Sequence, residues 1–150
     1  MQRRTKLRII YYLNVVLILL LVGYQLYLNL SETDYKSLHS AQVSRIKSIA
    51  QQEQFNFAVV GNINNSTQIF QKQLIPLINA SDNGFLISAG NAVSGGAEEN
   101  YRSLFKLLNE LKIPWLLTYG EKEDSDFGDV RFYQHLGPHF FSFTAGVIHK

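Results

Sequence analysis

The chain has 150 residues, of which 46% are hydrophobic, 17% are charged and none is cysteine. This length fits one domain, the composition argues against a disordered chain, and the lack of cysteine excludes disulfide scaffolds, zinc–thiolate sites and thiol nucleophiles. The formal net charge of +2 arises in the first eight residues, which hold four cations, so the remainder carries a net charge of −2. No basic face lies beyond this short tail, and we expect no nucleic-acid partner.

Residues 1–8 form a basic tail that precedes an uncharged, mostly apolar run over residues 9–30. A run of this length crosses a ~30 Å hydrocarbon core as a helix, and tyrosines near both of its ends match the aromatic enrichment of membrane interfaces. Because positively charged flanks stay in the cytoplasm, we predict a single-pass anchor in the plasma membrane, with the N-terminus cytoplasmic and the remainder extracytoplasmic. A cleaved signal peptide is the alternative, but no small-residue cleavage pattern follows the run.

Two polar residues inside the apolar run, Asn14 and Gln25, are predicted to face a partner helix. Side-chain amides form hydrogen bonds between helices in lipid and so fix an assembly. The predicted partners are therefore membrane lipid and another membrane protein.

Residues 31–54 are predicted to form an amphipathic connector helix, because apolar residues recur with a roughly helical period. Ser31, with Asp34 three residues later, resembles a capping box and predicts a fresh helix start. The apolar stripe is narrow and the segment is not notably basic. These features favour a spacer that packs on the following domain over a helix that lies on the membrane or on a partner.

Residues 55–150 alternate short apolar runs with segments of helical spacing. Strands are predicted at residues 55–60, 84–88 and 114–119, and helices at 68–78 and 98–111. This alternation favours right-handed βαβ units with a largely parallel sheet, so the predicted fold class is α/β. A glycine and a polar residue end each strand, and the three pairs should converge on one crevice at the carboxyl ends of the strands. The pairs are Gly61–Asn62, Gly90–Asn91 and Gly120–Glu121.

The spacing of these motifs resembles the calcineurin-like metallophosphoesterase family over about the last two thirds of the chain. The family's motifs GDxH, GDxxxxG and GNH(D/E) correspond here to Gly61-Asn-Ile-Asn64, Gly90-Asn-Ala-Val-Ser-Gly95 and Gly120-Glu-Lys-Glu123. Residues 132–143 also resemble a family segment that leads into the next strand. The resemblance implies the first half of a layered sheet, completed either by a continuation of the chain or by another polypeptide.

The family's ligand positions hold different residues in this chain. The resemblance places them at Asn62, Asn64, Asn91, Glu121 and Lys122, where the family has mainly aspartate and histidine. Two adjacent divalent cations repel each other and need carboxylates to neutralise them, which neutral amides and an ammonium group do not do. We therefore predict no metal and no cofactor, with the Asn amides and a Glu121–Lys122 pair satisfying the polar groups of the site.

The predicted function is that of a catalytically degenerate, phosphoesterase-like domain that serves as a binding, assembly or regulatory subunit of a membrane complex. An active phosphoesterase is an open alternative, with a Mn, Fe or Zn pair held by Glu121, Asp124 or Asp126 and by histidines beyond residue 150. A sensor for a phosphate-bearing ligand is another. A glycine-rich loop at Ser94, Gly95 and Gly96 would cradle the anion through its backbone N–H groups.

Two further features receive structural interpretations. The acidic stretch 121–129 lacks the ligand spacing of a calcium loop and is interpreted as a solvated turn. The histidines His135 and His139 fall in a predicted loop, His149 falls in a final apolar segment, and all three are expected to be structural.

Overall fold

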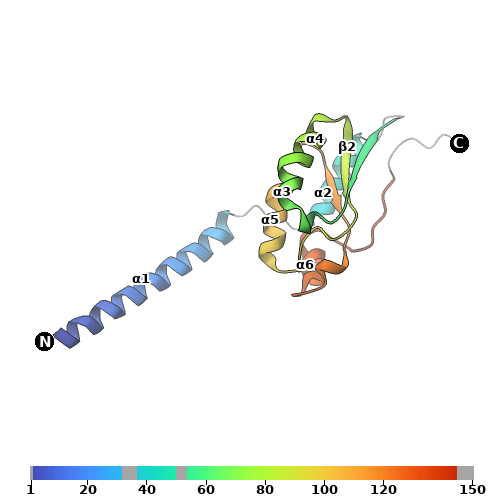
Figure 1. Ribbon diagram of the computed structural model, residues 1–150. Coiled ribbons are helices and arrows are strands. Elements are labelled where there is room, and N and C mark those ends of the chain that lie inside the picture. The colour runs from blue at the N-terminus through green and yellow to red at the C-terminus, as the bar shows by residue number, and fades with distance from the viewer. Residues whose placement is uncertain (1, 32–36, 50–53, 145–150) are drawn as a thin grey trace. The chain divides into compact units, whose positions relative to one another are not determined.

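A computed structural model describes residues 2–31, 37–49 and 54–144 of the chain (Figure 1). The chain divides into two compact units, Met1–Asp34 and Tyr35–Lys150. The described part of the first unit is one long helix. The second unit combines helices with a small sheet, so the mixed helix and strand class predicted from the sequence is confirmed.

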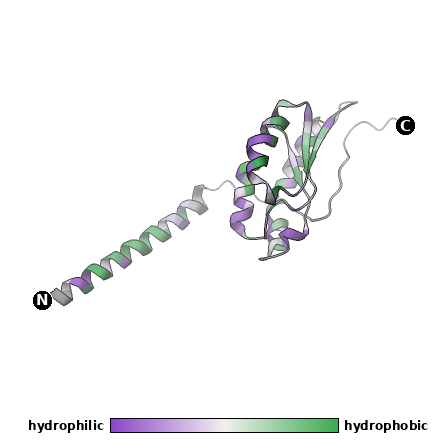
Figure 2. Ribbon diagram, in the orientation of Figure 1, coloured by the Kyte–Doolittle hydropathy of each residue, from purple (hydrophilic) through white to green (hydrophobic). Residues whose placement is uncertain are grey.

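The first unit contains helix α1, Gln2–Ser31. Its segment Thr5–Tyr27 has 23 residues and is long and apolar enough to cross a membrane, since 23 residues rise ~35 Å. Figure 2 shows hydrophobic residues along most of this helix. The helix begins within the basic tail, before the predicted boundary at residue 9. It also ends with Ser31, which is therefore helical and not the cap of a new helix.

The connector contains helix α2, Leu38–Ile49, which is shorter than the predicted segment 31–54. Residues 32–36 and 50–53 of that segment lie outside the described residues. Helix α2 buries His39, Gln42 and Ile46 against the domain. The connector helix therefore packs on the domain that follows it.

Three parallel strands form the sheet in the order β1-β2-β3. They are β1, Asn56–Val60, β2, Asn83–Ser88, and β3, Trp115–Leu117. Each lies at its predicted place, since short apolar runs bounded by turn residues are typical of parallel strands. Strands β2 and β3 are largely buried, whereas Phe57 and Val59 of β1 are exposed. The pairing of Val60 with Ser88, and of Ser88 with Leu117, aligns the three carboxyl ends at one edge.

One face of the sheet packs against a helical segment after β1 and a second helix after β2 (Figure 1). The first comprises α3, Thr67–Ile69, the π-helical turn η2, Phe70–Leu74, and α4, Ile75–Ala80. The second is α5, Glu98–Leu108. The main core lies between these helices and the sheet, and its fully buried members include Phe70, Leu86, Leu108 and Leu117.

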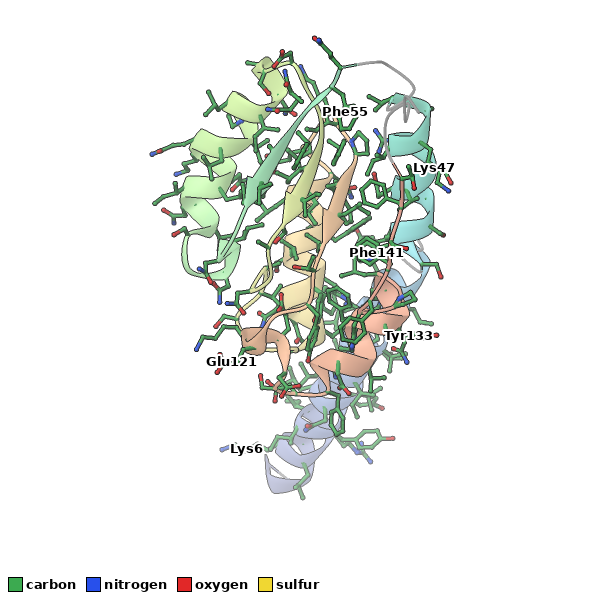
Figure 3. All side chains as sticks on the ribbon, turned by 90° about the vertical axis from the view of Figure 1, so that its right-hand side faces the viewer. Lys6, Lys47, Phe55, Glu121, Tyr133 and Phe141 are labelled. Carbon is green, nitrogen blue, oxygen red and sulfur yellow. The ribbon has the colours of Figure 1, made fainter. Side chains whose placement is uncertain are left out.

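The opposite face of the sheet packs against α2. Ile46 of this helix joins Phe85 and Leu116 in a second apolar cluster, and the partly buried Phe141 and Phe143 pack on it. Figure 3 shows Phe141 on the side of the sheet that faces α2. The sheet therefore has helices on both faces.

The segment after β3 contains helical elements that the sequence analysis did not predict. They are the 3-10 turn η3, Glu121–Glu123, and helix α6, Gly128–His135. Another 3-10 turn that was not predicted, η1, spans Ile63–Asn65 and follows β1. Helix α6 has only eight residues, too few for a clear apolar period, and it is held by the buried Phe132 and by Leu136, which follows it. His135 accordingly lies in a helix and not in the predicted loop.

Candidate functional site

The three glycine–polar pairs at the strand ends come together, as expected for parallel strands. The backbone N–H of Asn62 donates to the carbonyl of Gly90 at 3.3 Å. A Cβ on Gly90, whose φ is +78°, would lie 3.3 Å from the Cα of Gly120. The loops after β1, β2 and β3 are thus in direct contact, and glycine permits their close approach.

Asn62 and Asn91 form the centre of this cluster. The side-chain N–H of Asn91 donates to Oδ1 of Asn62 at 2.9 Å, and Oδ1 of Asn91 accepts the backbone N–H of Lys122 at 3.0 Å. Both asparagines have left-handed backbones, with φ of 53° and 54°. Asparagine tolerates this conformation better than most residues do, so the backbone is a second reason for its presence at both positions.

Asn64 lies beside this pair without joining its side-chain bonds. Its backbone N–H donates to the carbonyl of Asn91 at 3.3 Å. Its Oδ1 is buried and has no hydrogen-bond partner in the described part of the chain. Asn64 also lines a pocket of about 120 Å³, together with Thr67, Ser94 and Asn100.

Glu123 is the residue that organises the site, and the sequence analysis did not single it out. Its side chain is 0% exposed. Oε1 accepts the backbone N–H groups of Ala92 at 2.6 Å and Val93 at 3.4 Å, while Oε2 accepts those of Asn91 at 3.2 Å and Gly120 at 2.5 Å. The available signal was its place at the end of the stretch Gly120-Glu-Lys-Glu123, which directly follows the third predicted strand.

Burial raises the pKa of the Glu123 carboxyl above its usual range, and the four N–H donors oppose this shift. The loop after β2 binds this carboxyl group through the backbone N–H groups of Asn91, Ala92 and Val93. The carboxyl group belongs to a side chain of the same domain and also accepts the N–H of Gly120, so Glu123 joins the loops after β2 and β3.

Glu121 and Lys122 do not make the predicted pair. Both are exposed, and within the described residues no salt bridge joins them. Glu121 lies on the loop after β3 (Figure 3). The polar groups at the strand ends are satisfied by Glu123 instead, because a buried carboxylate with two acceptor oxygens reaches four backbone donors. The interpretation of residues 121–129 as a solvated turn is therefore wrong for Glu123.

The candidate anion site at Ser94, Gly95 and Gly96 has its glycine N–H groups already engaged. Gly95 donates to the carbonyl of Lys122 at 2.9 Å, and Gly96 donates to the carbonyl of Ser125 at 3.1 Å. Ser94 lines the pocket beside Asn64. The two glycines thus hold the acidic loop in place and do not direct their N–H groups toward solvent.

The acids named for a hydrolase, and the two histidines His135 and His139 that were expected to be structural, are spread over separate contacts. Asp124 accepts a hydrogen bond from the hydroxyl of Tyr119 at 3.0 Å, and His139 stacks on Tyr119 with ring centroids 4.5 Å apart. His135 lies 3.1 Å from Glu98. Asp126 lies beside Arg131, which bonds its backbone carbonyl. Across residues 2–31, 37–49 and 54–144, no three His, Asp or Glu side chains gather in a metal-binding group.

Of the two polar residues predicted to contact a membrane partner, Asn14 uses its side-chain N–H within α1. That group donates to the carbonyl of Ile10 at 2.8 Å, one turn earlier. Gln25 is exposed on the same helix. His149 lies outside the described residues.

The candidate site is therefore a network of hydrogen bonds formed by asparagine side chains, backbone N–H groups and one buried carboxyl group. Its side chains bond to one another and to the backbone of neighbouring loops, an arrangement suited to holding three loops rigid. Comparison of the chain with models of protein families, with curated proteins and with solved structures gives no significant match.

Proposed function

We propose that the chain is a single-pass membrane protein whose N-terminus is cytoplasmic and whose domain lies on the opposite side of the plasma membrane. Two features support the proposal. Helix α1 is long and apolar enough to cross a membrane. Four cations also precede its apolar part and none follows within it, the asymmetry that retains a flank in the cytoplasm.

A thiol-accessibility experiment tests this orientation, because the chain has no cysteine of its own. Single cysteines replace Gln2, before the apolar segment, and Lys106, an exposed position on α5. In intact cells, an impermeant maleimide is expected to label the Lys106→Cys variant and not the Gln2→Cys variant. The reverse pattern would overturn the orientation, and equal labelling of both would overturn the anchor.

We propose further that the domain is a degenerate relative of the metallophosphoesterases that binds or assembles with partners and does not catalyse. The hydrogen bond between Asn91 and Asn62 carries this proposal. In the family pattern these two positions hold aspartates that bind the metals. Here each amide uses a side-chain atom to satisfy the other. A neutral donor–acceptor pair supplies no charge to offset two adjacent cations.

The proposal is tested on the purified full chain in detergent with Mn²⁺ or Zn²⁺ and a generic phosphodiester. We expect no stoichiometric metal uptake in isothermal titration and no turnover. Stoichiometric metal together with turnover would overturn the proposal in favour of a hydrolase with altered ligands. Heat released on titration with phosphate esters, without cleavage, would instead identify a phosphate sensor.

A further inference from the structure

The pocket beside Asn64 is formed by η1, the start of α3, the loop after β2 and one side of α5. Its apolar lining comes from buried side chains, among them Ile63, Val93 and Leu104. The pocket volume is about 120 Å³. Since one water molecule needs about 10–15 Å³ of such space, the pocket has room for about ten non-hydrogen atoms. This room is close to the size of one sugar ring.

The polar side chains that line the pocket are all uncharged. They are Asn64, Thr67, Ser94, Asn100 and Ser103. None of the described residues in the lining carries a carboxylate, an ammonium or a guanidinium group. An ion that entered the pocket would lose hydration without gaining an opposite charge. Hydroxyl and amide groups both donate and accept hydrogen bonds, so the lining is suited to a neutral ligand with hydroxyl groups.

Several of these side chains have unused hydrogen-bonding capacity. The side-chain N–H groups of Asn100 donate to the carbonyls of Ser94 at 2.7 Å and Gly95 at 3.1 Å, which fixes the amide and leaves its Oδ1 as an acceptor. Within the described part of the chain, the hydroxyls of Thr67 and Ser94 make no hydrogen bond. The buried Oδ1 of Asn64 also lacks a partner there. A ligand donor that reaches this oxygen recovers the cost of an unsatisfied acceptor.

The backbone of the loop after β2 does not turn this pocket into an anion site. The N–H groups of Ala92 and Val93 bond the carboxyl group of Glu123. Those of Gly95 and Gly96 bond backbone carbonyls. A phosphate or carboxylate group in the pocket would therefore not meet a cluster of free N–H donors of the kind that binds anions.

We propose that this pocket binds a neutral, hydroxylated ligand of about the size of one sugar ring. The C–H groups of the ligand contact the apolar lining, and its hydroxyl groups bond the side chains of Thr67, Ser94 and Asn100. Pockets for small ligands combine an apolar lining with a few polar groups in this way. The inference depends neither on the membrane anchor nor on the loss of the metal site.

Saturation-transfer NMR on the full chain tests the proposal. The chain is held in lauryldimethylamine oxide, a detergent without a sugar headgroup that would compete for the pocket. The neutral probes are glucose, galactose, mannose and N-acetylglucosamine, and glucose 6-phosphate is the charged counterpart. A ligand of this size is expected to bind with a Kd on the order of 1 mM.

Three variants locate the binding. Ser103→Trp sets a large side chain at an exposed position of the lining. Lys106→Trp is the matched control, because Lys106 is also exposed on α5 and lies outside the lining. Thr67→Val removes one hydroxyl at nearly the same volume. We expect Ser103→Trp to lose the signal, Lys106→Trp to keep it, and Thr67→Val to raise the Kd severalfold through one lost hydrogen bond.

Circular dichroism establishes that each variant is folded, and Thr67→Val keeps the test decisive if Ser103→Trp does not fold. Failure of all four neutral sugars to bind at concentrations well above the expected Kd would overturn the proposal. Unchanged binding in both Ser103→Trp and Thr67→Val would place the sugar outside this pocket and overturn it as well. Tighter binding of glucose 6-phosphate than of glucose would overturn the preference for a neutral ligand.

Discussion

The imidazole Nε2 of His39 accepts the backbone N–H of Leu117 at 3.2 Å, so a side chain of the connector helix closes the outer edge of the sheet. One turn later, Oε1 of Gln42 accepts the N–H of Trp115 at 3.3 Å. An open strand edge is a template for unwanted pairing, and these two acceptors occupy the edge of β3. Helix α2 thus supplies the hydrogen bonds that a neighbouring strand would otherwise make.

This arrangement predicts that acid weakens the domain through His39. Burial lowers the pKa of His39 to about 4, against about 6.5 in an unfolded chain. Between about pH 6.5 and pH 4, His39 therefore binds a proton in the unfolded state but not in the folded state. The free energy of unfolding falls as the pH drops through this range. The full contribution is about 3 kcal/mol. Urea unfolding followed by the fluorescence of the single, buried Trp115 measures it.

The control for this prediction is His39→Gln, which keeps an acceptor near Leu117 and does not titrate. Glu123 has a raised pKa and acts in the opposite sense, because its contribution to stability falls as the pH rises above its unfolded value. It is present in both proteins, so the difference between their pH profiles isolates His39. Parallel profiles between pH 7 and 4 would contradict the prediction.

The strands were predictable from the sequence, whereas the contacts that hold the sheet edge and the site were not. Short apolar runs ending in glycine locate β1, β2 and β3, because strands of a covered parallel sheet need such runs. Burial on both faces applies to β3 and to most of β2, whereas Phe57 and Val59 of β1 are exposed. Helix α2 is different. Its most buried positions include His39 and Gln42, which a search for apolar periodicity counts as solvent-facing. Polar side chains are buried at these two positions because they accept hydrogen bonds from the backbone of β3, which apolar periodicity does not reveal.

Glu123 shows the same limit at the site. It stands in a stretch of five acids in which its neighbours Glu121 and Asp124 are exposed, and composition does not distinguish the buried acid from the solvated ones. The convergence of the strand-end loops followed from the topology of a parallel sheet. The turn η3 determines which of the acids contacts the loop after β2. This turn has only three residues, so no apolar periodicity in the sequence predicts it.

Glu123→Gln is expected to destabilise the domain by about 2–6 kcal/mol. Glutamine has a similar volume but only one acceptor oxygen, so at least two of the four buried backbone donors lose their partner, at about 1–3 kcal/mol each. Glu121→Gln, two residues earlier and exposed, is the matched control and should change stability by less than about 0.5 kcal/mol. Equal stability of the two variants in urea unfolding would show that the carboxylate does not hold the loops.

Two glycines that follow strands of the sheet, Gly61 after β1 and Gly120 after β3, should respond differently to alanine. A Cβ on Gly120 would lie 2.3 Å from the backbone nitrogen of Asn91 and 2.8 Å from Oε2 of Glu123, whereas a Cβ on Gly61 meets nothing closer than 3.9 Å. We expect Gly120→Ala to cost about 2–3 kcal/mol, because the loops must separate. Gly61→Ala should be neutral or slightly stabilising, by less than about 1 kcal/mol. Thermal unfolding of both variants and of the wild type in one buffer measures these effects. A Gly120→Ala variant as stable as the wild type would contradict the prediction.

Replacing Asn62 and Asn91 by aspartate, singly and together, tests whether the site still fits a cation once its charge is restored. Asn62→Asp keeps an acceptor for the side-chain N–H of Asn91, and in Asn91→Asp a rotated Asn62 amide donates to the new carboxylate, so each single change should be mild. The double variant sets two carboxylates where the amides now lie 2.9 Å apart. Two such groups do not both ionise without a counter-ion.

The double variant is therefore expected to be less stable at neutral pH than the two single variants predict together, by about 1–3 kcal/mol. Mn²⁺ should reverse this loss in the double variant and leave the wild type unchanged, because the wild-type amides carry no charge to attract the ion. Urea unfolding of all four proteins with and without Mn²⁺ measures the coupling. If the destabilisation of the double variant equals the sum of the two single effects, the carboxylates do not face each other. If Mn²⁺ stabilises the wild type, the site formed by Asn62 and Asn91 already binds a metal.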